Sequence, residues 1–235
     1  MKLALLLVAA VVAATVSGAT GFGGALLLLP TLVFVVGVKA AVPLLTLAQL
    51  GGNLSRAAFG WRDIAWRPVG VFLTGCIPGA VAGALLFVRI PEAVATRIVG
   101  ISVLALVAVR RFKPGLHLPR RWLAPAGLLL GLASGLVGSV GPLQAVVFLG
   151  LRLPPTAFVA TEAAAAMVLH LVKLSAYGGS SLLTNTQWGL GLTLALAMVL
   201  GSWIGRRLLE RVPDRVMACI IEITLVASGV ALLFR

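Results

Sequence analysis

Charged side chains are scarce in this sequence: they make up 11% of its 235 residues, whereas 60% of the residues are hydrophobic. The mean hydropathy is +1.12. This composition is typical of an integral membrane protein. The longest polar connection, residues 110–121, is too short for a soluble domain. We therefore expect a multi-pass protein of the cell membrane, the inner membrane in a bacterium.

Metal-site, disulfide and nucleotide motifs are also missing. The two cysteines, Cys76 and Cys219, stand alone within apolar segments, with no CxxC spacing and no histidine cluster nearby. Neither a metal site nor a disulfide framework is indicated, and both residues are interpreted as packing residues. Because there is no Walker A or other nucleotide motif, we expect no cofactor. Any transport would then be driven by an ion gradient or by the gradient of the substrate.

The net charge of +13 would suggest nucleic acid as a partner of a soluble chain. Here nearly all the Lys and Arg residues lie in short loops between apolar segments, where positive charge fixes membrane orientation. The expected partners are therefore the lipid bilayer and a small substrate, with no nucleic acid. A homodimer is compatible with the sequence, which does not decide the oligomeric state.

A glycine-rich break, residues 17–24, interrupts the apolar run from Leu3 to Val36. Each interior glycine costs about 1 kcal/mol of helix propensity relative to alanine. The break predicts two pieces, residues 3–16 and 25–36, each shorter than the ~20 residues of a membrane crossing. Non-helical backbone at membrane depth persists only where protein or a water-filled cavity satisfies its polar groups. We therefore interpret the break as the floor of a binding site.

A second break, residues 134–142, follows the same pattern in the other half of the chain. A shift of 117 places Ser17-Gly18 on Ser134-Gly135, Gly21 on Gly138 and Gly24 on Gly141. Further apolar runs are expected to form helices at about residues 40–59, 69–88, 93–109, 123–137, 143–151, 156–178, 187–205 and 216–234. The order of these matches predicts two transmembrane repeats, residues 1–117 and 118–235. An internal copy of the first segment also argues against reading that segment as a cleaved signal peptide.

Loop charges favour an inverted arrangement of the two repeats. If each broken segment is a re-entrant hairpin followed by three transmembrane helices, twelve Lys and Arg residues lie on one side of the membrane and five on the other. If each broken segment crosses the membrane instead, the division is nine to eight. Only the first arrangement obeys the positive-inside rule, and it places both termini outside the cytoplasm. The expected fold is thus an all-α polytopic membrane protein with two inverted repeats, a plan common among secondary transporters.

The two breaks supply the first group of candidate binding residues. A helix N-terminus offers unpaired N–H groups and partial positive charge, which favour an anion. The alternative is that these glycines only allow close helix packing, as the GxxxG spacing of Gly79 and Gly83 indicates for that pair. The substrate-binding candidates in the breaks are Ser17, Thr20, Gly21, Gly23, Gly24, Gly138, Ser139 and Gly141.

Polar side chains inside the run at residues 40–59 and its counterpart form a second group. Gln49, Asn53 and Arg56 follow one another at spacings of four and three, on one stripe of a helix. Lys173 occupies nearly the place of Arg56 in the second half. Because charges in hydrocarbon are costly, such residues usually face a bundle interior or a cavity. The alternative is that both cations snorkel to the membrane surface.

Two titratable residues on the run at residues 156–178 are candidates for a coupling or proton-carrying role. Glu162 lies on a stretch of alanines, where it would pair with a cation or carry a proton. His170 would titrate near neutral pH. The alternative for His170 is a hydrogen-bonded packing histidine. Glu222, in the last run, has no counterpart in the first half, where Gly100 stands, and remains unexplained.

With its two glycine-rich segments, each opening one half, the chain resembles the TauE/SafE family of sulfite exporter-like permeases. The segment from Ser17-Gly18 to Gly24, followed by Pro30, is similar to the first family motif, and the segment from Ser134-Gly135 to Gly141 is similar to the second. The second departs from the usual glycine run at Ser139 and Val140. The resemblance covers essentially the whole chain. It implies movement of sulfite, sulfonates, sulfoacetate or another small anion across the cytoplasmic membrane.

The sequence thus predicts a permease that holds a small anion at paired half-helix N-termini and works by alternating access. Two other classes stay open. An intramembrane hydrolase would have to use His117 or His170, and no G-x-S-x-G motif surrounds Ser17 or Ser134. Turnover in detergent rather than flux into liposomes would identify such an enzyme. An accessory membrane subunit would show no stabilisation by any anion.

Overall fold

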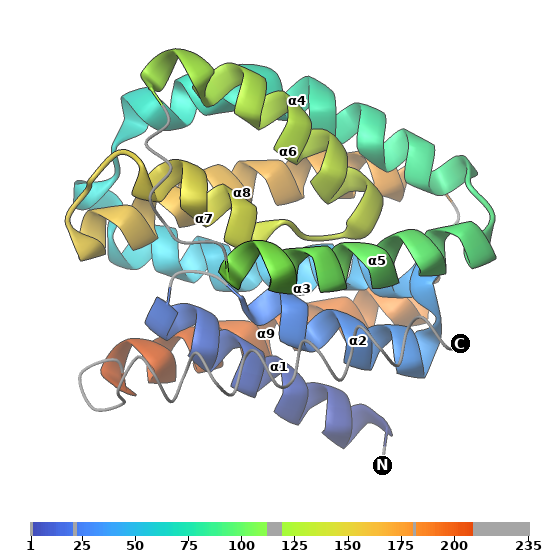
Figure 1. Ribbon diagram of the computed structural model, residues 1–235. Coiled ribbons are helices and arrows are strands. Elements are labelled where there is room, and N and C mark those ends of the chain that lie inside the picture. Colours follow the sequence, from blue (N-terminus) through green and yellow to red (C-terminus); the bar gives the residue numbers. More distant parts are fainter. Residues whose placement is uncertain (1, 21–22, 112–118, 181, 209–235) are drawn as a thin grey trace.

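The computed structural model describes residues 2–20, 23–111, 119–180 and 182–208, which are helical throughout except for short turns. No strand occurs in these ranges (Figure 1). The helices are α1 (Lys2–Thr20), α2 (Gly24–Val36), α3 (Val38–Phe59), α4 (Trp66–Arg89), α5 (Glu92–Arg111), α6 (Leu123–Val137), α7 (Gly141–Leu149), α8 (Pro155–Gly178) and α9 (Asn185–Leu208). Two 3₁₀ turns, η1 (Trp61–Asp63) and η2 (Arg120–Trp122), precede α4 and α6. The all-α fold expected from the sequence is confirmed, and the run expected at residues 216–234, with Cys219 and Glu222, lies outside the described residues.

The first break is shorter than the sequence predicts, because α1 continues through Ser17 and ends only at Thr20. Hydroxyl groups on this part of α1, including that of Ser17 in the expected break, bond to the backbone of the helix itself. Thr15 Oγ1 donates to Val11 O at 2.8 Å, and Ser17 Oγ donates to Ala14 O at 3.3 Å. Such bonds to the preceding turn keep Ser and Thr within a helix. The expected end of the first helix at residue 16 is therefore wrong.

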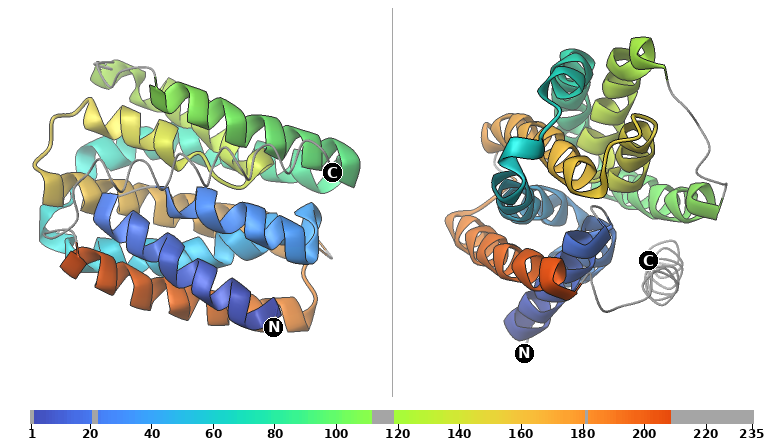
Figure 2. Two further views of the ribbon diagram at one scale, coloured as in Figure 1. Left: turned by 60° about the horizontal axis from the view of Figure 1, so that its bottom comes forward. Right: turned by 90° about the vertical axis from the view of Figure 1, so that its left-hand side faces the viewer.

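Each broken segment folds as a pair of antiparallel helices, α1 with α2 and α6 with α7 (Figures 1 and 2). The short helices α2 and α7 begin near the middle of the molecule and run toward opposite ends. Gly37, whose φ of 79° favours glycine, lies between α2 and α3 and turns the chain back. The chain therefore places two helix N-termini in the interior.

Close backbone contact joins α4 to α6. A Cβ on Gly75, Gly79 or Gly83 of α4 would lie 1.9 to 2.2 Å from a carbonyl oxygen of α6. Gly127 and Gly131 of α6 approach carbonyl oxygens of α4 in the same way, at 2.2 and 2.3 Å. The packing role expected for Gly79 and Gly83 is confirmed, since small residues let membrane helices approach closely.

The same kind of contact joins α9 to α1. A Cβ on Gly201 would lie 2.5 Å from Val11 O, and one on Gly205 would lie 2.2 Å from Thr15 O. In the sequence, a shift of 122 places Gly79 on Gly201 and Gly83 on Gly205. The pair α9 and α1 is thus the counterpart of the pair α4 and α6.

The remaining helix contacts show the same correspondence between the two halves of the chain. Helix α3 packs on α9 as its counterpart α8 packs on α4, and α3 and α8 pack on each other. Each helix from α1 to α4 also runs opposite to its counterpart from α6 to α9 (Figure 1). These relations support our proposal that residues 1–117 and 118–235 are inverted repeats.

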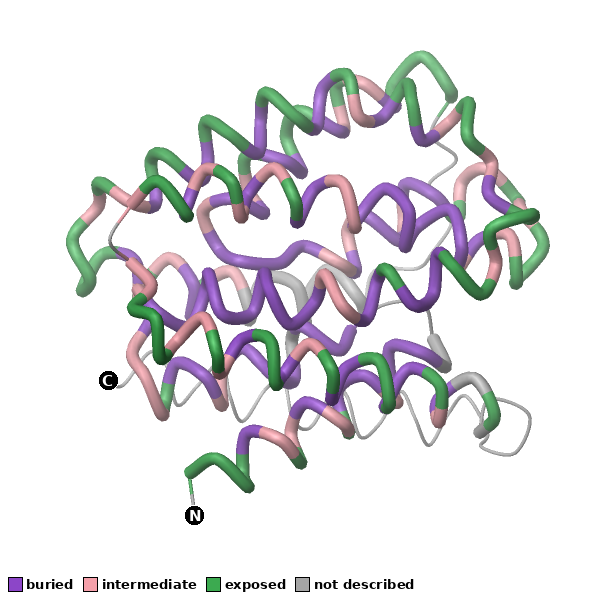
Figure 3. Tube along the Cα trace, turned by 180° about the vertical axis from the view of Figure 1, so that it is seen from behind, coloured by how far each residue is buried: buried purple, intermediate pink, exposed green. Residues whose placement is uncertain are grey.

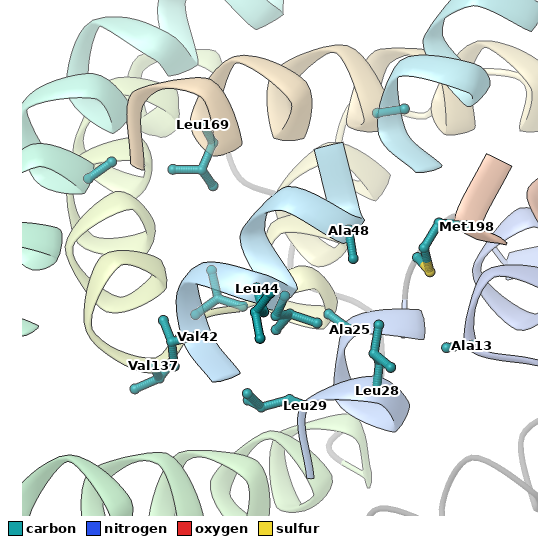
Figure 4. Close-up of a cluster of buried hydrophobic side chains, with 14 of the residues drawn as sticks. Ala13, Ala25, Leu28, Leu29, Val42, Leu44, Ala48, Val137, Leu169 and Met198 are labelled. Carbon is teal, nitrogen blue, oxygen red and sulfur yellow. The ribbon is translucent and has the colours of Figure 1, made fainter. Parts of the chain in front are cut away.

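Helices α3 and α8 form the buried centre, whereas the outer helices expose apolar side chains (Figure 3). Leu196 of α9 is 72% exposed and Val8 of α1 is 63% exposed, as expected of residues that face lipid. Within the described residues, three helical stretches are long and apolar enough to span a membrane: Trp66–Arg89, Pro155–Gly178 and Asn185–Gly205. Figure 4 shows part of the core, where Leu28 of α2 and Leu44 of α3 belong to one cluster of buried side chains.

Positive charge is unequal between the two ends of the bundle. The starts of α4, α6 and α8 lie at the same end as the last turns of α3, α5, α7 and α9 (Figure 1). This end carries Arg62, Arg67, Arg120, Arg121, Arg152 and Arg207, and the opposite end carries Lys2, Lys39, Arg89 and Arg97.

We predict that the end with more arginine is cytoplasmic. A reporter that is active only in the cytoplasm should give a strong signal when inserted between residues 112 and 118, and none when fused before Lys2 or after Arg235. A cytoplasmic signal from either terminal fusion would contradict this orientation.

Candidate functional site

A small polar cavity of about 30 Å³ lies where the two helix pairs meet α3 and α8. The hairpin turns contribute backbone and small side chains, and α3 and α8 contribute the larger polar groups. The lining residues are Ser17, Gly23, Gly24, Ala25, Gln49, Asn53, Arg56, Ser134, Ser139, Val140, Gly141, Gln144, Glu162, Ala166, Leu169 and His170. Both halves of the chain thus contribute to one site.

Arg56 is the only lysine or arginine among the lining residues. It is 6% exposed, so it does not snorkel to the membrane surface. Its Nη1 donates to Ser17 Oγ at 2.9 Å, and its Nη2 donates to Asn53 Oδ1 at 2.6 Å. The second bond follows from the i, i+3 spacing on α3, which places the two side chains on one face. These acceptors are neutral, so they orient the guanidinium without neutralising its positive charge.

Buried polar atoms without hydrogen-bond partners gather at this cavity. In the described part of the chain, five buried side-chain nitrogen or oxygen atoms have no such partner. Four of them belong to lining residues: Gln49 Nε2, Arg56 Nε, Glu162 Oε2 and His170 Nδ1. Leaving such a group unpaired costs roughly 1 to 3 kcal/mol. Their convergence on one cavity is the pattern of a site that binds a polar ligand or water.

The N-terminus of α2 reaches the cavity without a side-chain cap. Gly23, the residue before α2, has a φ of 97°, which favours glycine. Because glycine has no side chain, it cannot cap the helix. A Cβ on Gly24 would lie 2.3 Å from Ala13 O, so Gly24 also allows α1 and α2 to approach closely. The backbone at Gly24 and Ala25 is therefore held directly at the cavity wall.

The N-terminus of α7 differs because it has fewer N–H groups to offer. Pro142 has none, the N–H of Gly141 bonds to Ser139 Oγ at 3.4 Å, and the N–H groups of Leu143 and Gln144 bond to Val140 O. The two helix ends expected to hold an anion together are thus unequal. Helix α7 contributes the side chain of Gln144 to the cavity instead.

Lys173, the counterpart of Arg56, does not line the cavity. It is fully buried, and its Nζ donates to Ser134 Oγ at 3.0 Å, Gly138 O at 2.7 Å and Ser134 O at 3.4 Å. Both cations thus bond to the corresponding serine, Arg56 to Ser17 and Lys173 to Ser134. Lys173 also satisfies carbonyl groups at the end of α6, where cations are favoured.

We therefore predict that Lys173→Met lowers stability rather than anion affinity. The substitution removes the Lys173 donor from the Gly138 carbonyl and the Ser134 hydroxyl, which should cost about 1 to 3 kcal/mol. The thermal melting temperature without anion should fall, while the affinity of the folded fraction stays within about twofold of wild type. A normal melting temperature with lost anion binding would make Lys173 a ligand instead.

The structure brings together most of the side chains that the sequence suggested. The candidates that line the cavity are Ser17, Gly23, Gly24, Gln49, Asn53, Arg56, Ser139, Gly141, Glu162 and His170. Gly138 and Lys173 are not among the lining residues, whereas Gly21 and the side chain of Thr20 lie outside the described part of the structure.

Sequence reasoning missed Gln144, a polar residue that lies two positions after Pro142 in the short helix α7. Its Nε2 donates to both the main-chain oxygen and Oε1 of Glu162 at 3.2 Å. The signal available in the sequence was the single amide side chain of Gln144 within the apolar run at residues 143–151. Ser134 was recognised as part of the second break but was not chosen as a site residue.

No group of three or more His, Cys, Asp or Glu side chains in the described residues is arranged to hold a metal ion. The site is instead a buried cationic and amide-rich cavity at the ends of interrupted helices. Such a cavity inside a bundle with lipid-facing apolar helices defines a polytopic α-helical membrane protein of the transporter class.

The family model described as sulfite exporter TauE/SafE matches residues 6–232. The chain therefore belongs to this family of membrane transporters, as the glycine-rich segments indicated. No curated protein and no solved structure matches the chain.

Proposed function

We propose that this protein is a secondary transporter for a small sulfur-containing anion of the sulfite, sulfonate or sulfoacetate class. The observation that carries the proposal is the cavity formed by both halves, at which four buried polar atoms, one of them Arg56 Nε, have no partner in the described residues. The family supports the substrate class.

The anion would lie between the guanidinium of Arg56 and the N-terminus of α2. Charge-assisted hydrogen bonds from a guanidinium to an oxyanion are stronger than neutral ones. The amide Nε2 of Gln49 would supply a further donor, and the Ser139 hydroxyl would approach from the opposite half. A cavity of about 30 Å³ favours a compact head group such as sulfite or a sulfonate over a bulky one.

Alternating access would come from movement of one half relative to the other. The site lies at the contact between the halves, because α3 and α8 pack on each other beside the cavity. Opening this contact toward one end and then the other would expose the same anion to the two sides in turn.

The test is uptake of radioactive sulfite by liposomes that contain the purified protein. We expect uptake well above that of protein-free liposomes, and competition by methanesulfonate and sulfoacetate. Flux without competition by either compound would restrict the substrate to inorganic sulfite. No flux, combined with no stabilisation of the purified chain by any of these anions, would contradict the proposal and favour an accessory subunit.

A further inference from the structure

Glu162 is the only acidic side chain that lines the cavity in the described residues. It is 3% exposed and lies on α8. Its Oε1 accepts a hydrogen bond from Gln144 Nε2, whereas its Oε2 has no partner. One carboxyl oxygen is therefore held by an amide, and the other is available for a proton.

The charged and titratable groups around Glu162 come from several helices. Arg56 of α3 and His170 of α8 line the same cavity. Lys173 of α8 directs its Nζ to the end of α6. The elements packed on α8 carry further groups, which are Lys39 on α3, Cys76, Arg67 and Arg89 on α4, and Arg62 and Asp63 on η1, whereas α7 carries none. Among the described residues, Arg56 is thus the one Lys or Arg that lines the cavity together with Glu162.

A charged carboxylate in this position conflicts with anion binding. It would oppose the positive charge of Arg56 and repel an entering anion. Its unpartnered Oε2 would also be a buried charged atom without a hydrogen bond. A neutral carboxyl group removes both difficulties, because an O–H at Oε2 can donate to an oxygen of the anion.

We propose that Glu162 carries a proton at Oε2 that crosses the membrane together with the anion, which makes the protein a proton–anion cotransporter. This inference rests on the proposed transport function. The proton comes from the aqueous phase on the entry side, stays on Oε2 while the anion is bound, and returns to water on the exit side. The protein is unchanged at the end of the cycle, and a pH gradient supplies the driving force.

The test compares the pH dependence of sulfite exchange in wild type and Glu162→Gln. Liposomes with equal sulfite concentration and equal pH on both sides are given a trace of radioactive sulfite, and the exchange rate is measured between about pH 6 and pH 9. The ionisation of sulfite changes equally for both proteins. Any difference between their profiles therefore belongs to Glu162.

We expect wild-type exchange to fall at high pH, because Glu162 loses its proton, and Glu162→Gln to lack this loss. The ratio of the variant rate to the wild-type rate should rise about tenfold for each pH unit above the titration of Glu162. Glu162→Ala should behave in the same way, which keeps the test usable if the Gln variant does not fold. Glu92→Gln, at an exposed site on α5 outside the cavity, is the control and should keep the wild-type profile, and His170→Gln tests whether the histidine carries the proton instead.

Parallel profiles for wild type and both Glu162 variants would overturn the inference while leaving transport intact. A flat profile in His170→Gln alone would overturn it by assigning the proton to the histidine. No wild-type exchange above protein-free liposomes at any pH would overturn the transport function itself, and this inference with it.

Discussion

Arg56→Gln is expected to weaken anion binding by roughly 10- to 100-fold, which corresponds to the loss of about 1.5 to 3 kcal/mol for charge-assisted hydrogen bonds. Among the described residues, Arg56 is the only lysine or arginine that lines the cavity, and the groups that orient it are neutral. The glutamine keeps a polar side chain near Asn53 but removes the positive charge. Binding is measured as the shift of the thermal melt with sulfite concentration.

Two further variants separate charge from geometry at this position. Arg97→Gln removes one positive charge at an exposed site and should bind as wild type does. Arg56→Lys keeps the charge, but an ammonium group lacks the planar, forked donors with which a guanidinium can contact Ser17 and an anion at the same time. An intermediate affinity is therefore expected. If Arg56→Gln folds and binds sulfite as tightly as wild type, Arg56 is not a ligand.

Gly79→Ala is expected to destabilise the protein by about 1 to 3 kcal/mol or more, as overpacking does. The added Cβ would lie 2.2 Å from Leu128 O, and backbone atoms of α6 cannot move aside as a flexible side chain can. The yield of monodisperse protein and its melting temperature should both fall, because α4 and α6 would be forced apart.

Gly70→Ala provides a matched control in the same helix. Gly70 is exposed, and no heavy atom lies within 4 Å of a Cβ at this position. This variant should purify and melt as wild type does. An equal loss in both variants would mean that the contact with α6 does not determine the result, because helix propensity alone favours alanine over glycine.

Much of the fold could be predicted because apolar runs and their interruptions are strong signals in a membrane protein. The boundaries of α6 and α8 were predicted within about one residue. The end of α1 was missed because Ser17 satisfies its hydroxyl within the helix, and no propensity value reports such a bond. Propensity describes the residue type, whereas this outcome depends on the neighbouring turn.

The site could be predicted as a set of residue types but not as a geometry. The spacing of Gln49, Asn53 and Arg56 placed them on one face, and the structure brings that face to the cavity. The equivalent positions of Arg56 and Lys173 suggested equal roles, yet Lys173 is held by carbonyl groups at the end of α6. A sequence comparison aligns positions but does not show which partner each side chain finds.

The most direct test of the anion site is a structure of the protein crystallised with selenite, the heavier analogue of sulfite, and located by the anomalous signal of selenium. We predict a selenium peak in the cavity, with oxygen atoms within hydrogen-bonding distance of the Arg56 guanidinium and the main chain at Gly24 and Ala25. The peak should be absent in Arg56→Gln at the same selenite concentration. A cavity without selenium, at a concentration that competes with sulfite for uptake, would contradict the account.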